Sequence, residues 1–391
     1  MLPVSRNIAR SFLPSNQELS FVGSSLDKGK YKVTGFLGRG SSGAVIYRVS
    51  DEEGEHAVKR VDTRIDALEW STKNEHILHS FVSEHPHVIS YHGFFVDSQH
   101  THLLTAVCEG GRLCDFVDET PLFWRNDENI RRVFLSIVRA VRYCHSRGIA
   151  HRDINPENVL AVDKFGDTFV LADFGKATTE KKSKQFGLGL AAYSAPECLA
   201  GESHTAYDTR IADVWSLGIL LLNMVTGATP WTAPRTSHAA YTSFLSEPIH
   251  LQRILPVSGD LVALLARVLD PRPRRRMSIV ELERAVVAMR SFSMSDAELG
   301  LEHRSAARGR VELRARLLGV PWQAPPIRSI HDSDSSGDSL WSRSGSSTTS
   351  IWSSRDGHGG STLRRLSSLS LRLRSRPSSF TIKSRLSTIA A

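Results

Sequence analysis

The pattern of apolar and polar residues gives the first half of this chain a β texture. Between residue 31 and about residue 109, short apolar runs are separated by Gly and acidic turns, which is typical of β-strands. Three of these runs predict strands at Tyr31–Phe36, Ala44–Val49 and Glu55–Val61. The spacing over Ala67–Phe81 changes to that of a helix with one apolar side.

Helical periodicity dominates from residue 112 onward. It predicts a helix over Asn129–Arg147, which Gly148 would end, and buried helices over Val214–Thr226 and Leu261–Leu269. A small β-rich half is thus followed by a larger helical half. We therefore expect an α+β fold with two lobes and a cleft between them.

The composition changes sharply near the C-terminus. Residues 325–391 hold 21 Ser, ten basic and four acidic residues, so they carry +6 of the net charge of +8. Such a segment is too polar to offset chain entropy by burial, and we predict that it is disordered. We assign residues 291–324 to a basic helical linker and residues 1–30 to a flexible N-terminal extension. Because the charge lies in a tail without interleaved aromatic periodicity, specific nucleic-acid binding is not favoured.

Cysteine usage and hydropathy bear on the compartment. No apolar run approaches the roughly 18 residues of a membrane span, so no transmembrane segment is expected. The four cysteines form no C-x-x-C pair, which favours reduced thiols in the cytoplasm, with the nucleus as a further possibility. A weak transit peptide in the first 16 residues, with Arg6 and Arg10 and no acid, is a less favoured alternative.

A glycine-rich segment lies between the first two predicted strands. Gly38, Gly40 and Gly43 have the spacing G-x-G-x-x-G, which alone also fits a dinucleotide fold or a flexible turn. A strand on each side disfavours the strand-to-helix turn of a dinucleotide fold. The pattern favours a hairpin whose backbone can lie over phosphate oxygens.

Two charged residues follow this segment at equal intervals. Lys59 lies sixteen residues after Gly43 on a predicted strand, and Glu75 lies sixteen residues further on in a helical segment. A Lys–Glu pair from a strand and a helix would hold the ammonium against nucleotide phosphates. For either residue alone, a solvated surface pair is the favoured alternative.

The catalytic candidates lie in the second half. Asp153, in the run His151–Asn158, can accept a hydroxyl proton, and Asn158 can bind Mg²⁺ through its amide oxygen. Asp173 begins an Asp-Phe-Gly triplet twenty residues after Asp153, and it supplies a carboxylate for Mg²⁺ that bridges the phosphates.

This series of motifs, together with Ala195-Pro196-Glu197, resembles the eukaryotic protein kinase family in order and spacing. The resemblance spans about residues 31–290 and implies a bilobal protein kinase domain that uses ATP and Mg²⁺. Residues 155–158 are closest to the serine/threonine form, which implies protein substrates with Ser or Thr acceptors. Residues 213–231 resemble fungal kinases of the nutrient- and meiosis-control type.

The resemblance implies a role for each motif residue. Asp153 would be the catalytic base, Lys59 would hold the α- and β-phosphates, and Asn158 and Asp173 would bind Mg²⁺. The nucleotide-binding set would comprise Gly38, Arg39, Gly40, Ser41, Ser42, Gly43, Val45, Ala57, Lys59, Glu75, Ala106, Cys108, Leu160 and Asp173.

Within this set the resemblance separates adenine contacts from phosphate contacts. Val45, Ala57 and Leu160 would enclose adenine, whereas the carbonyl of Ala106 and the N–H of Cys108 would meet its edge.

Other residues would support the site or its regulation. Glu197 would form a buried ion pair with Arg276, and Asp213 would hydrogen-bond the backbone around His151. Glu157 would favour a basic substrate. The activation segment is the stretch between Asp173 and Glu197, with Thr178, Thr179 and Ser183 as candidate phosphorylation sites. A phosphate there would pair with Arg152, although an unmodified segment is equally compatible with the sequence. The basic tail could dock a regulatory partner, although a solvated charged tail is the favoured alternative.

Three positions depart from the family pattern. Asn155 stands where serine/threonine kinases carry a Lys that contacts the γ-phosphate and the catalytic Asp, and Leu190 stands where they carry Thr or Ser. Arg112 replaces an acid that often reaches the ribose. Because no metal ligand is lost, we expect an active enzyme. The alternative is a pseudokinase, a nucleotide-binding scaffold without useful transfer.

Overall fold

The described part of the chain forms one structural unit. The computed structural model describes residues 14–40, 43–62, 74–201 and 205–327, all within the unit that spans residues 1–333. The start of the predicted helix over Ala67–Phe81, the loop residues Ser41 and Ser42, and the predicted disordered tail from residue 328 lie outside the described residues.

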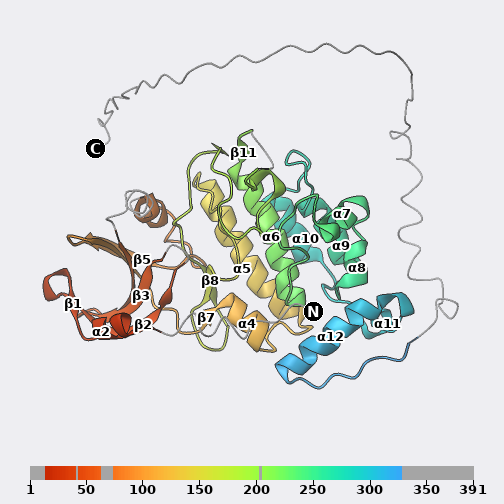
Figure 1. Ribbon diagram of the computed structural model, residues 1–391, viewed down its shortest axis with the longest axis horizontal. Coiled ribbons are helices and arrows are strands. Elements are labelled where there is room, and N and C mark those ends of the chain that lie inside the picture. The colour runs from red at the N-terminus through yellow and green to blue at the C-terminus, as the bar shows by residue number, and fades with distance from the viewer. Residues whose placement is uncertain (1–13, 41–42, 63–73, 202–204, 328–391) are drawn as a thin grey trace, which may run out of the picture. The chain divides into compact units, whose positions relative to one another are not determined.

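An antiparallel sheet builds the first lobe (Figure 1). Its six strands run in the order β1-β2-β3-β4-β6-β5, which places β4 between β3 and β6. The alternation seen in the sequence buries Val33, Val49 and Val58 in one apolar cluster. The strands are β1 (Ser25–Leu26), β2 (Tyr31–Arg39), β3 (Val45–Ser50), β4 (Glu55–Asp62), β5 (Tyr91–Val96) and β6 (His100–Thr105).

Residues 15–30, which we expected to be a flexible extension, are instead part of this lobe. Helix α2 (Asn16–Phe21) begins at Ser15, which forms a capping box with Glu18. Phe21 packs on Tyr47 with 5.0 Å between ring centroids, and β1 pairs with β2. The expectation was wrong because this segment buries apolar side chains against the sheet. Residues 1–13 lie outside the described residues.

Helices build the second lobe around α6 (Thr209–Thr226), which is buried on nearly every side. Asp208 caps its first turn and Gly227, at φ 70°, ends it in the left-handed conformation. The other helices are α4 (Leu113–Glu119), α5 (Asp127–Ser146), α7 (Ala239–Ser246), α8 (His250–Ile254), α9 (Gly259–Val268) and α10 (Ile279–Ala288). Among the described helices, none has both the length and the apolar character that crossing a bilayer requires.

Short elements complete this lobe. A three-stranded sheet in the order β7-β8-β9 lies beside the cleft, and β10 pairs with β11 further along the chain. Their bounds are β7 (Gly111–Arg112), β8 (Val159–Ala161), β9 (Phe169–Leu171), β10 (Lys182–Ser183) and β11 (Tyr207–Asp208). Short 3-10 helices span Pro196–Cys198 and Glu302–Arg304 in this lobe, and Asp27–Gly29 between β1 and β2 in the first lobe.

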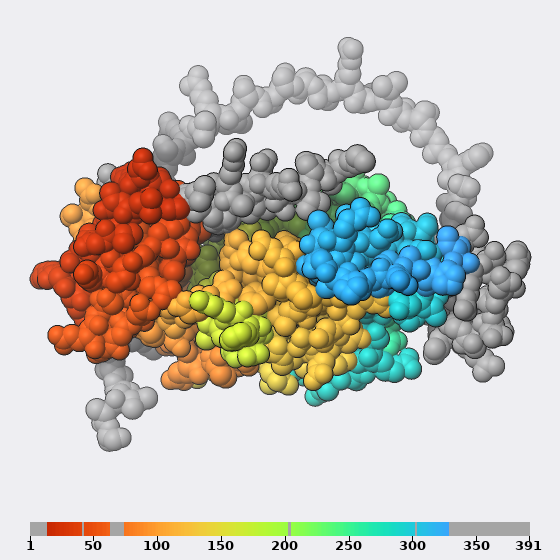
Figure 2. Space-filling model, turned by 90° about the horizontal axis from the view of Figure 1, so that it is seen from below, coloured from red at the N-terminus to blue at the C-terminus, as the bar shows by residue number. Residues whose placement is uncertain are grey.

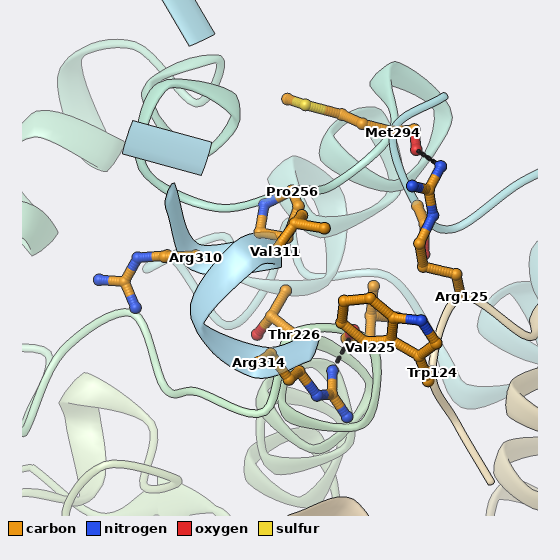
Figure 3. Close-up of a pocket in the computed structure, with 10 residues that line it drawn as sticks. Trp124, Arg125, Val225, Thr226, Pro256, Met294, Arg310, Val311 and Arg314 are labelled. Carbon is orange, nitrogen blue, oxygen red and sulfur yellow. Dashed lines mark hydrogen bonds between the residues drawn. The ribbon is translucent and has the colours of Figure 1, made fainter. Parts of the chain in front are cut away.

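The segment after α10, which we assigned to a basic helical linker, docks on the helical lobe. Its helices are α11 (Asp296–Leu299) and α12 (Ser305–Leu318), drawn in blue in Figure 2. Figure 3 shows Arg314 of α12 beside Trp124 and Val225, and its guanidinium donates to the Val225 carbonyl at 2.7 Å. The cavity between α12 and the helical lobe has a volume of about 10 Å³, which holds no more than one water. The segment therefore packs closely against the lobe.

A buried ion pair joins two distant parts of the helical lobe, as the resemblance implied. The guanidinium of Arg276 donates to both carboxylate oxygens of Glu197, at 2.7 and 2.9 Å. The Arg276 side chain has no exposed surface and also donates to the carbonyls of Asp270 and Ile211. All the N–H groups of the Arg276 guanidinium therefore have acceptors. The pair holds the segment that carries Glu197 against α6 and against the loop that precedes α10.

Replacing Arg276 by Met should lower the free energy of unfolding by about 3–5 kcal/mol, because Glu197 would stay buried without a partner. Urea unfolding of the full chain measures this value. Arg274→Met, at an exposed neighbouring position, is the matched control and should change stability by less than about 0.5 kcal/mol. Equal effects of the two variants would contradict the buried pair.

Candidate active site

A cavity of about 380 Å³ opens where the two lobes meet. The first lobe contributes residues of β2, β3, β4 and β6, and the second contributes residues between 157 and 173. The structure gathers ten residues of the predicted nucleotide set here: Gly38, Arg39, Gly40, Ala57, Lys59, Glu75, Ala106, Cys108, Leu160 and Asp173. Gly43 is not among the lining residues, and Ser41 and Ser42 lie outside the described residues.

One predicted adenine contact, Val45, does not line the cavity, and its neighbour Ile46 does. In the ladder of β3 and β4, Ile46 lies directly opposite Lys59, and directly opposite residues share a face of a sheet. Ile46 therefore lines the cavity, whereas Val45 packs into the apolar cluster of the first lobe. A register shift in the pairing of β2 with β3, between Phe36 and Gly38, accompanies this change.

The connection after β6 forms one wall of the cavity. Thr105, Ala106 and Cys108 all line it, and the backbone N–H of Ala106 donates to the carbonyl of Ser90 at 2.9 Å. Burial, helped by Glu109, raises the pKa of the Cys108 thiol to about 11, so the thiol stays protonated at neutral pH. This wall presents backbone and apolar atoms, which suits a planar, weakly polar ring.

A lysine and two carboxylates meet at the floor of the cavity. The Nζ atom of Lys59 lies 2.8 and 2.9 Å from the carboxylate oxygens of Glu75, and 2.8 Å from Oδ1 of Asp173. Burial alone would lower the pKa of Lys59, but Asp173 and Glu75 together raise it above its ordinary value. Burial would raise the pKa of Asp173, but Lys59 brings it down to about 2. The ammonium and the Asp173 carboxylate are thus both charged at neutral pH.

The backbone at Asp173 takes an uncommon conformation that aims its carboxylate at Lys59. Its φ is 60°, in the left-handed region that few residues with side chains adopt. The N–H of Gly175 donates to Oδ1 of Asp173 at 3.2 Å. A Cβ at Gly175 would lie 3.1 Å from that oxygen and 3.3 Å from Glu75, so the position favours glycine. Strain of this kind is retained where the surroundings hold the chain firmly.

The run His151–Asn158, which the resemblance makes the catalytic loop, is held by Asp213 of α6, as the resemblance implied. Its two carboxylate oxygens accept from the N–H groups of His151 and Arg152, at 2.9 and 2.8 Å. The side chain of Asn158 donates its amide N–H to the carbonyl of Asp153 at 2.8 Å. Asp153 and Asn158 are both buried; Asn158 lines the cavity, and Asp153 is joined to Asn158 by this hydrogen bond without being a lining residue.

The residues present fit a magnesium ion. Asn158 uses its amide nitrogen for the bond to Asp153, which leaves the amide oxygen as its metal-binding atom, and Asp173 supplies an ionised carboxylate. Within the described ranges, no group of three or more His, Cys, Asp or Glu residues could hold a metal. One carboxylate and one amide suit Mg²⁺, which keeps several waters and shares substrate phosphates, and do not make a closed zinc site.

Asn155 stands where the family carries a lysine, and a different lysine, Lys176, contacts Asp153 in this structure. This contact was not predicted from the sequence. The Nζ atom of Lys176 lies 2.6 Å from Oδ2 of Asp153, and Asn155 donates to Oδ1 at 3.0 Å. Leu190 is exposed, while its neighbour Gly189 lies so close that a Cβ there would be 2.7 Å from Oδ1 of Asp153. A basic residue directly after the Asp-Phe-Gly triplet was the only sequence signal for this contact.

The acid expected at position 112 is supplied three residues later. Arg112 pairs with Asp115 at 2.9 Å, and both residues line the cavity. An acidic group therefore still lies at this edge of the cavity, with a guanidinium beside it.

Arg152 holds the activation segment by hydrogen bonds to neutral oxygen atoms. Its guanidinium donates to the carbonyl of Lys176, to Oε1 of Gln185 at 2.7 Å and to Oγ of Ser183 at 3.4 Å. Of the candidate phosphorylation sites, Ser183 is buried and Thr179 is exposed. Phosphorylation of the segment stays a prediction.

Three aromatic rings connect the two lobes behind Asp173. Phe174 is fully buried, stacked on His79 at 4.8 Å and packed edge-on against His151 at 5.0 Å between ring centroids. His79 follows Glu75 by one helical turn in the helical segment 74–80, and its Nε2 bonds the carbonyl of Ile89 at 2.8 Å. Burial lowers the pKa of His79 to about 4, so the ring is neutral at pH 7.

Comparisons with known proteins agree with this geometry. A family model described as "Protein kinase domain" matches residues 31–286. "Negative regulator of sexual conjugation and meiosis" of Schizosaccharomyces pombe is 34% identical over 277 residues, which cover 64% of this chain and 58% of that protein. "Serine/threonine-protein kinase ksp1" of the same yeast is 30% identical over 286 residues, covering 70% and 60%. "Serine/threonine-protein kinase VHS1" of Saccharomyces cerevisiae is 31% identical over 236 residues, covering 55% and 49%. The chain thus spans about half to three-fifths of the length of these curated relatives.

The neutral ring of His79 predicts a pH dependence of stability. Between pH 6.5 and pH 4 the unfolded chain binds a proton at His79 and the folded chain does not. The free energy of unfolding should therefore fall as the pH decreases, by about 2 kcal/mol from this residue between pH 6.5 and pH 5.

Urea unfolding at both pH values, for the wild type and for His79→Leu, isolates this contribution from those of other titrating groups. We expect the variant to lose about 2 kcal/mol less than the wild type over this interval. An identical fall in both proteins would show that His79 does not titrate as its burial requires.

Proposed function

Because the chain belongs to the protein kinase family, we propose that it transfers the γ-phosphate of ATP to serine and threonine hydroxyls of proteins. The observation that supports this most strongly is the contact of Lys59 with Glu75 and Asp173 at 2.8 Å, beside Asn158 and Asp153. An ammonium, a metal-binding pair and a proton acceptor are the groups that phosphoryl transfer requires in one place.

Each residue has a distinct part in this mechanism. Lys59 presents a fixed positive charge to the phosphates, and Glu75 keeps its side chain in position. Asn158 and Asp173 would hold Mg²⁺, which supplies charge neutralisation on the phosphate oxygens when bound. Asp153 orients the substrate hydroxyl and accepts its proton through its carboxylate. The protein contributes positioning and electrostatics, and no covalent intermediate on the chain is needed.

The pseudokinase alternative has little structural support. It depends on the loss of a cation at Asn155 and of a hydroxyl at Leu190. Asp153 nevertheless carries an ammonium from Lys176 at 2.6 Å, and Asn155 still donates to its other oxygen. Serine/threonine kinases are also the named class of two of the relatives reported above. An active enzyme is therefore the reading that we adopt.

Substrate preference, partners and location belong to the same proposal. Glu157 is exposed and lines the cavity, which supports a preference for basic residues near the acceptor. Four free cysteines support a reducing compartment, in the cytoplasm or the nucleus. The docking of a regulatory partner on the basic segment 325–391 rests on its net charge of +6 alone.

The proposal predicts Mg²⁺-dependent phosphorylation of a peptide library by the purified full chain. Peptides with Ser or Thr next to Arg or Lys should be the best substrates, and peptides whose sole acceptor is Tyr should stay unmodified. Asp153→Asn should slow transfer by roughly 10²–10⁴-fold, because the proton acceptor is lost. Asp167→Asn, at an exposed loop position, is the matched control and should have wild-type activity. Wild-type transfer no faster than that of Asp153→Asn would refute the proposal.

A further inference from the structure

The carboxylate of Asp153 is held on both oxygens by groups from different segments. Lys176 Nζ lies 2.6 Å from Oδ2, and Asn155 Nδ2 lies 3.0 Å from Oδ1. The side chain of Asp153 is 5% exposed and that of Lys176 is 29% exposed, so the carboxylate has given up most of its water while the ammonium keeps some. A buried carboxylate needs such a partner, because an unpaired buried charge is costly.

The position of Lys176 is fixed by the buried structure around it. Its carbonyl accepts a hydrogen bond from Nε of Arg152, whose own N–H is bound by Asp213. The N–H of the next residue, Ala177, donates to the carbonyl of the fully buried Phe174 at 3.0 Å. The backbone of Lys176 is therefore tied to the catalytic loop on one side and to the interlobe rings on the other. These hydrogen bonds fix the backbone position from which the Lys176 ammonium reaches Asp153.

Lys176 supplies the positive charge that the catalytic loop lacks at position 155. Asn155 is neutral, and within the described residues the cation on the Asp153 carboxylate comes from Lys176. In the proposed reaction, a negatively charged phosphoryl group meets a hydroxyl that Asp153 must orient. A cation beside the carboxylate reduces the repulsion between these negative groups, and the effect is largest where water is excluded.

We propose that Lys176, a lysine of the activation segment, is the positioning residue of Asp153. Its ammonium supplies the positive charge that the neutral side chain of Asn155 lacks. This inference rests on the proposed phosphoryl-transfer function and assigns a further residue to it. Lys176 does not line the nucleotide cavity. Its removal should therefore slow transfer and leave nucleotide affinity unchanged. The opposite view, that Lys176 blocks Asp153 and inhibits the enzyme, predicts faster transfer without it.

Steady-state kinetics of the full chain with its best library peptide separate these views. Lys176→Met should lower kcat roughly tenfold or more, with the KM for peptide and the Kd of a non-hydrolysable Mg–ATP analogue within about twofold of wild type. Lys176→Arg, which keeps the charge, should retain most of kcat. Lys184→Met removes an exposed lysine of the same segment and should have no effect. Thermal unfolding checks that each variant is folded.

The decisive variant returns the charge to the catalytic loop. Asn155 already reaches Oδ1 of Asp153, so the longer side chain of Asn155→Lys can reach the same carboxylate. The double variant Asn155→Lys/Lys176→Met should regain most of the wild-type kcat. Asn155→Ala/Lys176→Met should not, because it restores no cation.

Three outcomes would overturn the assignment. An unchanged or increased kcat in Lys176→Met would show that the lysine is unnecessary or inhibitory. Equal kcat values for the Asn155→Lys and Asn155→Ala double variants would show that charge on Asp153 is not what Lys176 supplies. Loss of nucleotide binding in folded Lys176→Met would assign it to the ATP site instead. A wild-type chain as slow as Asp153→Asn is a separate result, since it refutes the proposed function and with it this role.

Discussion

The contact of one ammonium with two carboxylates, Glu75 buried and Asp173 half-buried, is the constraint on which the whole structure depends. Lys59 comes from a strand, Glu75 from a helix and Asp173 from the other lobe. None of the three tolerates burial without the others, since an uncompensated charge in that position costs several kcal/mol. The sheet, the helical segment 74–80 and the loop after β9 must therefore close on one point, and that point is the floor of the cavity.

A second layer of contacts keeps this point fixed. Phe174 stacks on His79 and packs edge-on against His151, so the residue after Asp173 is held by both lobes. Asp213 then holds the catalytic loop from the central helix α6. These contacts hold the backbone of Asp173 in its left-handed conformation. The strained position and the charged groups thus lie on a rigid scaffold, which is what transition-state stabilisation by preorganised charge requires.

Family motifs predicted most of the site, including the distant pair of Glu197 with Arg276, and sequence reasoning failed at positions where the fold itself sets a side-chain direction or a partner. Lys59 and Asp173 lie in motifs that carry their own geometry, and both line the cavity. Ile46 lines the cavity in place of Val45 because one position of register turns a side chain to the other face of a strand. Lys176 was missed because its partner lies 23 residues away in a different loop. Residues 15–30 were misjudged because a short helix becomes stable only through its contacts with the sheet.

Binding of a non-hydrolysable ATP analogue, titrated calorimetrically with and without Mg²⁺, tests most directly whether this cavity holds a metal nucleotide. The two lobes meet at the carboxylate of Asp173, so that group should be where metal and nucleotide affinities couple. We predict that Mg²⁺ tightens binding to the wild type at least tenfold and that Asp173→Asn abolishes this gain while the fold remains intact. Binding that is equally strong with and without Mg²⁺ in the wild type, or undetectable under both conditions, would contradict the account.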